Sequence, residues 1–461
     1  MTTDSSRIDR ARARVAPILK TAVPIAIGQL GQMVMILVDM YVVGRIGSAA
    51  ISGVGLGNAF FYVFGMFCAG TLFGLDYFIS HAMGRKDLAD CHRWLWQGVW
   101  LSLGLSITLS TVIALTCPSY IQSHFPPEVA LPGVQFIQTL NLCLPSFLVF
   151  ITFRQYLQAT GSVNAGTVVT MMAIVLNAGL NWLFVLGSCG APRWGVSGAG
   201  FATTATRTAM AISLILYTFY RDRKLSQGLA ASSRRFEPGS LWKLLKLGAP
   251  IGFMLSLESG VFSLATAAIS RYGVVSAASH TIALNIASFT YMIPMALSGA
   301  AAILVGQALG RGERREAREM GWTCMAVTTV IMTCTGLTLA LAGHHVIGLF
   351  TKDEAVIALA SRVIMLVALF QVADGAQSVG GGALRGLGST RAAMGANIVG
   401  YWLIGLPLAW QFGERMQMGV MGFWIGLTIG LYAVATVVII RWVRIDVNTL
   451  ENPGEVSTFH V

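Results

Sequence analysis

The stretch LKTAVPI at residues 19–25 returns in the second half of the chain as LKLGAPI at residues 245–251, a shift of 226 residues. Four further pairs occur in the same order at nearly the same spacing. They are RIG (45–47) with RYG (271–273), MGRKD (83–87) with LGRGE (309–313), LQATGS (157–162) with LRGLGS (384–389), and WGVSGAG (194–200) with MGVMGFW (418–424). One such match is weak, but five in order predict two similar halves, as in many membrane transporters.

The composition predicts that these halves lie in a lipid bilayer. Of the 461 residues 55% are hydrophobic and only 11% are charged, whereas soluble proteins carry about 25% charged residues. A helix needs roughly 20 apolar residues to cross the hydrocarbon core. Twelve windows meet that length: 21–43, 49–80, 94–116, 133–157, 164–187, 195–219, 246–270, 275–306, 321–342, 357–384, 392–411 and 418–440. We expect an all-α integral membrane protein with twelve transmembrane helices in two pseudo-symmetric six-helix bundles.

The repeat also predicts the organisation of the chain. The expected parts are an N-lobe at 1–220, a basic linker at 221–245, a C-lobe at 246–442 and a tail at 443–461. Six spans bring each half back to the side from which it entered, so the halves are parallel repeats about an axis along the membrane normal. A substrate site is then expected between them near mid-depth, as alternating access requires.

The net charge of +11 is explained by the distribution of the basic residues. If the N-terminus is cytoplasmic, most of the 31 lysines and arginines lie in cytoplasmic segments. The opposite side keeps only Arg45, Arg193, Arg271, Lys352 and Arg415. This asymmetry is the positive-inside rule and predicts that both termini are cytoplasmic. Nucleic-acid binding is not needed to explain the charge.

The basic start is followed by too long an apolar run for a cleaved signal peptide, and we expect it to be the first helix.

Four acidic residues fall inside the expected helices: Asp39, Asp76, Glu258 and Asp374. Burying a carboxylate in the bilayer costs at least a few kcal/mol, so such residues mark functional sites by default. A buried acid can exchange a proton for Na⁺ or a cationic solute, which is what an antiporter requires. The alternative is an acid held by a neighbouring arginine, asparagine or backbone amide. Asp76 is close to the interface, where hydration would explain it equally well.

Other side chains at the depth of the membrane are candidates for the substrate cavity. The set is Asn177, Asn181, His280, Asn285, Phe370 and Gln371. Asn177 and Asn181 are one helical turn apart, so they either line a cavity with Asp39 or hold two helices together. His280 either titrates near neutrality or packs as a neutral side chain. Most polar residues of this kind are hydrogen-bond partners between helices.

The sequence contains no signal of catalysis or of nucleotide binding. It has no HExxH, no GxSxG and no Walker loop, and its seven cysteines include no CxxC. We therefore expect no enzyme activity, no nucleotide and no cofactor, and transport driven by an ion gradient. Cys117 and Cys189 fall near outer helix ends, where pairing stays open.

Several long motifs resemble one known family. They are LVDMYVVGRIGSAAISGVGLGN (37–58), VSAASHTIALNIASFTYMIPMALSGAA (275–301), ADGAQSVGGGALRGLGST (373–390) and GYWLIGLPLAW (400–410). Together they make the chain similar to the multidrug and toxic compound extrusion (MATE) transporters, and most of all to their bacterial NorM branch. The resemblance covers nearly the whole chain.

The resemblance implies a V-shaped fold and export of cationic, lipophilic drugs in exchange for H⁺ or Na⁺. Asp39 matches the aspartate of the N-lobe, whereas Glu258 and Asp374 match the acids of the C-lobe cation site, where Na⁺ would bind. NorM-like relatives often have a tyrosine at the position of Phe370, which cannot supply a hydroxyl; this favours protons over Na⁺. Asp76 resembles an acid of eukaryotic members.

A second hypothesis is a flippase for lipid-linked precursors, from the same wider superfamily. Such flippases tend to have a basic cavity and extra helices, whereas this chain has acids at depth and twelve expected helices. We therefore expect a monomeric exporter of cationic drugs in a bacterial inner membrane. Its surroundings are lipid, and no nucleic acid partner is expected.

Overall fold

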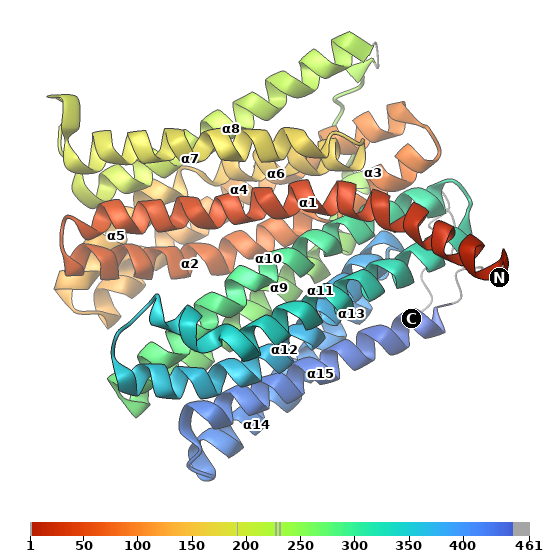
Figure 1. Ribbon diagram of the computed structural model, residues 1–461. Helices are drawn as coiled ribbons and strands as arrows, with labels where there is room; N and C mark the ends of the chain where they lie inside the picture. The colour runs from red at the N-terminus through yellow and green to blue at the C-terminus, as the bar shows by residue number, and fades with distance from the viewer. Residues whose placement is uncertain (1, 191, 226–227, 230–231, 446–461) are drawn as a thin grey trace. The chain divides into compact units, whose positions relative to one another are not determined.

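The computed structural model describes residues 2–190, 192–225, 228–229 and 232–445. These residues form helices and no strand (Figure 1). The α-helices are α1 (Thr2–Gly44), α2 (Ser48–Leu72), α3 (Leu75–Gly84), α4 (Leu88–His124), α5 (Pro127–Asn141), α6 (Leu144–Ala159), α7 (Val163–Leu186), α8 (Gly195–Leu225), α9 (Pro238–Ile269), α10 (Val274–Gly310), α11 (Arg314–Gly348), α12 (Glu354–Gly386), α13 (Thr390–Asn397), α14 (Leu406–Trp410) and α15 (Gly419–Arg444). Short helices are η1 (Ser188–Gly190) and η3 (Ser270–Tyr272), and π-helical turns form η4 (Ile398–Gly405) and η5 (Gln411–Arg415).

The expected number of membrane spans agrees with these helices. Within the described residues, eleven helices, some with short breaks, are long and apolar enough to cross a membrane, and α5 with α6 makes up to twelve. The span expected at 133–157 consists of two helices, because α5 and α6 meet at a bend of 49°. Pro145 is in the first turn of α6, where its missing N–H and its ring prevent α5 from continuing.

The chain packs into two compact units. The N unit runs from Ile27 to Gly252, and the C unit joins the residues up to Ala26 with those from Phe253 onward. In the C unit α12 packs against α10, α11 and α15. The repeat-based lobes and these packing units differ mainly in where the starts of α1 and α9 belong: each start packs with the other half of the sequence. Both divisions fall two residues after a proline, Pro24 in α1 and Pro250 in α9.

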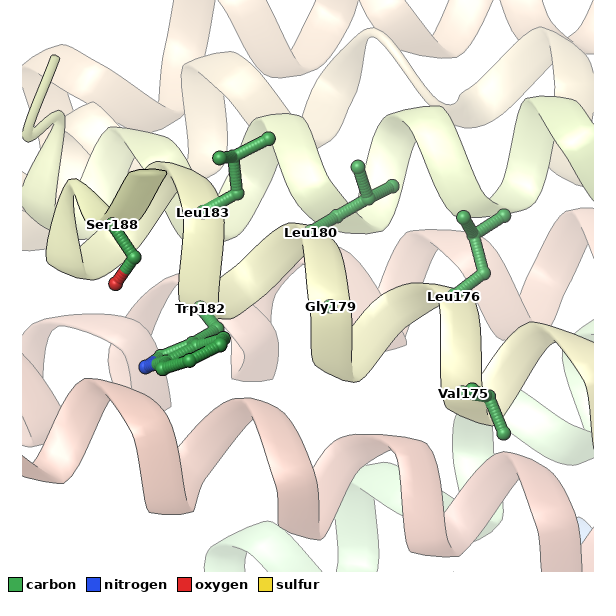
Figure 2. A pocket seen from close by; sticks show the side chains of 7 residues that line it. All are labelled: Val175, Leu176, Gly179, Leu180, Trp182, Leu183 and Ser188. Atoms are coloured by element: carbon green, nitrogen blue, oxygen red, sulfur yellow. The ribbon is translucent and has the colours of Figure 1, made fainter. Parts of the chain in front are cut away.

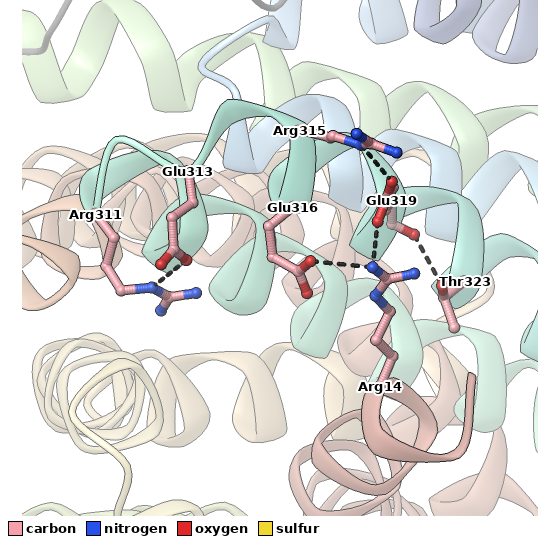
Figure 3. Close-up of polar contacts among 7 residues, drawn as sticks. All are labelled: Arg14, Arg311, Glu313, Arg315, Glu316, Glu319 and Thr323. Atoms are coloured by element: carbon pink, nitrogen blue, oxygen red, sulfur yellow. Dashed lines mark hydrogen bonds and ion pairs between the residues drawn. The ribbon is translucent and has the colours of Figure 1, made fainter. Parts of the chain in front are cut away.

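The start of α1 is fixed to the C unit by apolar and ionic contacts. Ile18 and Ala22 are buried in the core of that unit. The Arg14 guanidinium forms ion pairs with Glu319 and, at 3.3 Å, with Glu316, both from the first turns of α11 (Figure 3). Arg315 also pairs with Glu319, at 2.9 Å. Ion pairs with this much exposure contribute little individually, so the buried side chains carry most of the attachment.

Two glycines let the start of α9 approach α2 within the N unit. A Cβ atom at Gly248 would come 2.0 Å from the carbonyl oxygen of Thr71, and one at Gly252 would come 2.3 Å from that of Phe67. No heavy-atom contact of that length is possible, so a side chain at either position would force the helices apart. Glycine is therefore required where α9 crosses α2.

The cysteines whose side chains are described are free thiols, Cys117 among them. The side chain of Cys189 lies outside the described residues, as does the end of the expected tail from residue 446 onward.

The close approach predicts that Gly248→Ala lowers the thermal stability of the purified protein. Overpacking of this kind costs about 1–3 kcal/mol. Gly104→Ala is the matched control, because a Cβ at Gly104 meets nothing within 4 Å and alanine is the better helix former. Equal melting temperatures for the two variants in detergent would contradict the conclusion that glycine is required where α9 crosses α2.

Candidate functional sites in the two units

Asp39 is buried in the N unit and bound by two other helices. Only 6% of the residue is exposed. The Asn181 amide on α7 donates to Oδ1 at 2.5 Å, and the Thr203 hydroxyl on α8 donates to Oδ2 at 3.2 Å. Both carboxylate oxygens therefore have a donor, which is how a buried charge is stabilised. The arrangement joins α1 to α7 and α8.

Asn177 and Asn181 belong to the same buried face of α7. Both are 0% exposed, and the Asn181 amide also donates to Asn177 Oδ1 at 3.2 Å. The opposite face of α7 borders an apolar pocket of about 300 Å³ whose lining includes Leu180, Trp182 and Ser188 (Figure 2). This pocket contains none of the predicted site residues. Asn177 and Asn181 thus lie on the side of α7 that faces Asp39, and the residues lining the pocket lie on the other side.

Arg207 on α8 supplies a positive charge near Asp39. Its guanidinium lies over the rings of Phe147 and Phe61, 4.3 and 5.2 Å from the ring centres, and interacts electrostatically with Asp39. A cation held between aromatic faces is stabilised without a direct ion pair. The acid of the N unit therefore has a cation nearby.

Glu258 and Asp374 come together in the C unit from α9 and α12. Asp374 is 3% exposed, and the main charge acting on it is that of Glu258. The Oε2 atom of Glu258 is buried and has no hydrogen-bond partner among the described residues, while the Gln377 side chain interacts with this carboxylate. Two like charges side by side in a dry core repel one another, so a monovalent cation between them is favoured.

Aromatic side chains pack together about one helical turn from each of these acids. Phe370 is 3% exposed and its ring centre lies 6.0 Å from that of Phe262 on α9 and 5.9 Å from that of Trp424 on α15. The Phe262 ring is also 6.1 Å from the ring of Tyr401. These edge-to-face arrangements are the favoured geometry of aromatic pairs. Phe370 thus belongs to a cluster of aromatic rings and lies one helical turn before Asp374 on α12.

Gln371 and Asn285 have different surroundings. Gln371 is 0% exposed and its amide donates to the Thr290 hydroxyl on α10 at 2.5 Å. This bond links α12 to α10 one turn from Asp374. Asn285 is exposed on α10. The structure therefore places Gln371, but not Asn285, with the buried polar residues of the C unit.

His280 is held by a directed chain of hydrogen bonds. The Trp424 indole N–H donates to His280 Nδ1 at 3.2 Å, and His280 Nε2 is 2.9 Å from the Thr266 hydroxyl. An indole nitrogen can only donate, so Nδ1 must be the acceptor and Nε2 carries the hydrogen. This network fits a neutral imidazole, which joins α9, α10 and α15.

Asp76 is buried in the N unit and bonded to α6. It is 1% exposed, and the Gln155 amide on α6 donates to its Oδ1 at 2.7 Å. Arg154 interacts with it electrostatically.

Sequence reasoning singled out Asn177 and Asn181 but missed three other neutral residues near the acids. Thr203, Gln377 and Tyr401 are neither charged nor in a metal-binding spacing. Gln377 had a usable signal, because it follows Asp374 by three residues and so shares its helix face. Within the described residues, no group of three or more His, Cys, Asp or Glu side chains is arranged to hold a metal ion. Any Na⁺ bound at Glu258 and Asp374 would therefore use neutral oxygens as well.

Long apolar helices with ionisable groups in both cores define a helical integral membrane protein with polar sites at membrane depth. The MatE family model matches residues 24–183 and again residues 250–411, once in each half. The chain therefore belongs to the MatE family, the MATE transporters, whose members are transporters rather than enzymes.

Relatives and solved structures agree with this assignment. The chain is 32% identical over 431 residues to the multidrug resistance protein NorM of Burkholderia vietnamiensis, with 92% of each chain covered. It is 30% identical over 442 residues to the multidrug resistance protein MdtK of Yersinia pseudotuberculosis, covering 93% of this chain and 95% of the relative. A eukaryotic MATE transporter, AtDTX14, superposes with a TM-score of 0.85 at 20% identity over 95% of this chain and 98% of that one. The predicted family and fold class are confirmed.

The bonds to Asp39 predict that Asn181 and Asp39 are energetically coupled. Asn181→Ala removes a donor from a buried carboxylate and should lower the free energy of unfolding by about 1–3 kcal/mol. Because Asp39→Asn removes the charge that needs the donor, the double variant should lose less than the sum of the single variants.

Thermal unfolding of the four proteins of this cycle measures the coupling. Ser188→Ala, on the side of the pocket in Figure 2, is the control and should add independently to Asp39→Asn. Additive effects of Asn181→Ala and Asp39→Asn would show that the hydrogen bond contributes nothing.

Proposed function

We propose that this protein is a secondary active multidrug exporter that exchanges cationic, lipophilic drugs for H⁺ or Na⁺ by alternating access. Relatives that are 30–32% identical carry the name multidrug resistance protein. The coupling ion is the only cofactor that the proposal needs. The ion is cargo, exchanged in each cycle.

The observation that carries the proposal is the pair formed by Glu258 and Asp374. The Oε2 atom of Glu258 is buried and has no hydrogen-bond partner in the described part of the chain, and Glu258 is the main charge acting on Asp374. A site with surplus negative charge in a low-dielectric core binds one monovalent cation strongly and does not keep two carboxylates ionised without it. Such a site alternates between a state with a bound cation and a state without one, and coupling to an ion gradient requires this alternation. Phe370, without a hydroxyl, still favours a proton.

The chemistry of the drugs follows from the sign of the buried charges. Asp39, Glu258 and Asp374 favour a cationic solute in either unit, whereas a lipid-linked precursor would bring anionic phosphate groups. The Phe and Met side chains of a membrane bundle suit flat, apolar cations. The two units differ in the balance of charge around their acids. Asp39 has the positive charge of Arg207 near it, whereas the main charge acting on Asp374 in the C unit is the negative charge of Glu258.

The orientation and assembly belong to the same proposal. We place the chain in the bacterial inner membrane as a monomer, with both termini in the cytoplasm, because the basic residues concentrate on that side.

Neutralising either acid of the pair should abolish drug export. Glu258→Gln and Asp374→Asn keep the shape of the side chains but remove the charge that binds the ion, so we expect resistance of expressing cells to fall to that of the empty vector. Drug susceptibility at matched expression in the membrane measures it.

The control is Glu354→Gln, which changes an exposed acid at the start of α12, the helix that carries Asp374. It should export normally. Full resistance in both Glu258→Gln and Asp374→Asn would overturn the proposal.

A further inference from the structure

The segment GYWLIGLPLAW contains a helix of unusual geometry. Residues Ile398–Gly405 form π-helical turns between α13 and α14. Such turns are rare, and they often occur at functional sites because the wider turn changes the direction of side chains. Tyr401 lies inside this segment and is 0% exposed.

The π-helical segment is anchored to α9 beside Glu258. The Trp402 indole N–H donates to the carbonyl oxygen of Leu257, the residue before Glu258, at 3.2 Å. Tyr401 packs on Phe262, one helical turn after Glu258, with ring centres 6.1 Å apart. Consecutive residues of η4 therefore contact α9 on both sides of the glutamate. Tyr401 is within electrostatic reach of both Glu258 and Asp374.

Three buried oxygens at this place have no hydrogen-bond partner among the described residues: the Tyr401 hydroxyl, Glu258 Oε2 and Gln377 Oε1. Buried polar atoms of native proteins are nearly always paired, and exceptions call for an explanation such as an ion that completes the site. A phenol hydroxyl can either donate to a carboxylate or offer its lone pairs to a cation. Packing on Phe262 needs only the ring, so the hydroxyl itself has no structural role there.

We propose that the Tyr401 hydroxyl belongs to the cation site of Glu258 and Asp374 and sets its affinity for the coupling ion. Phe370 on α12 also packs on Phe262, with ring centres 6.0 Å apart, and its side chain has no hydroxyl to offer. Two tyrosines interact electrostatically with both acids, Tyr291 on α10 and Tyr401 in η4. The Tyr291 side chain also interacts with Ser378, whereas the Tyr401 hydroxyl has no hydrogen-bond partner among the described residues. The unpartnered phenol oxygen of the site therefore comes from the π-helical turn. The inference rests on the proposed ion coupling at the two acids.

The test is the ion dependence of drug transport by Tyr401→Phe in proteoliposomes. If the ion is Na⁺, the variant loses an oxygen ligand, and the Na⁺ concentration for half-maximal transport should rise about tenfold. If the ion is H⁺, the variant loses a donor that stabilises the unprotonated pair. The proton concentration for half-maximal coupling should then fall by about the same factor. In both cases the variant should change the ion concentration for half-maximal transport more than it changes the maximal transport rate. A general packing defect would not produce this pattern.

Tyr272→Phe is the matched control. It removes the hydroxyl of a half-buried tyrosine of the C unit whose side chain interacts with Glu414 and not with the acid pair. Its ion dependence should equal that of the unmodified protein. The double variant Tyr401→Phe with Phe370→Tyr returns a hydroxyl one turn before Asp374 and should move the ion affinity back toward the original value.

Parallel measurements on Glu258→Gln and Asp374→Asn separate the two proposals. If these variants keep ion-coupled transport, the proposed function of the acid pair fails. If they are inactive while Tyr401→Phe shows unchanged affinity for both ions, the assignment of Tyr401 is overturned. If the double variant has the same ion affinity as Tyr401→Phe alone, a hydroxyl at position 370 does not replace the one at position 401, and that part of the proposal is wrong.

Discussion

The constraint on which the rest depends is the cost of a charge inside the bilayer, where there is little water to solvate it. Each buried acid of this chain has to obtain its stabilisation from other side chains or from a bound cation. Asp39 obtains it from Asn181 and Thr203, with Arg207 nearby. Glu258 and Asp374 mainly meet one another, which leaves negative charge unbalanced. The same physical requirement thus leaves Asp39 stabilised by neighbouring side chains, whereas we expect Glu258 and Asp374 to need a bound cation.

The scaffold around these acids is duplicated, but the acids are not. The family model matches both halves, at residues 24–183 and 250–411. At the offset of 226 residues, however, Glu258 corresponds to Gln32 and Asp39 to Ala265. Each half supplies the same helical frame, with a proline in its first helix, and each frame carries different chemistry. This asymmetry supports a division of ion and drug binding between the units.

The sequence predicted the features that depend on composition and order along the chain. Twelve apolar windows, the repeat and the four acids within the helices required only hydrophobicity, spacing and the cost of charge. The bend at Pro145 was missed because the hydrophobic window runs through it without a break. The partners of the acids were missed for a different reason: Thr203, Gln377 and Tyr401 gain their roles from neighbouring helices, and no pattern within one helix shows which side chains meet. The π-helical turn that places Tyr401 is equally invisible to helical periodicity.

The central claim is that an ion gradient, acting on the acids of this chain, moves drug against its own gradient. The most direct measurement records drug and ion fluxes together in proteoliposomes containing the unmodified protein, with a pH or Na⁺ gradient imposed separately. The account predicts that one of the two gradients drives uphill drug movement and that drug added on the opposite side moves that ion in return. Drug that only equilibrates, with neither gradient affecting it and no ion movement in exchange, would contradict it.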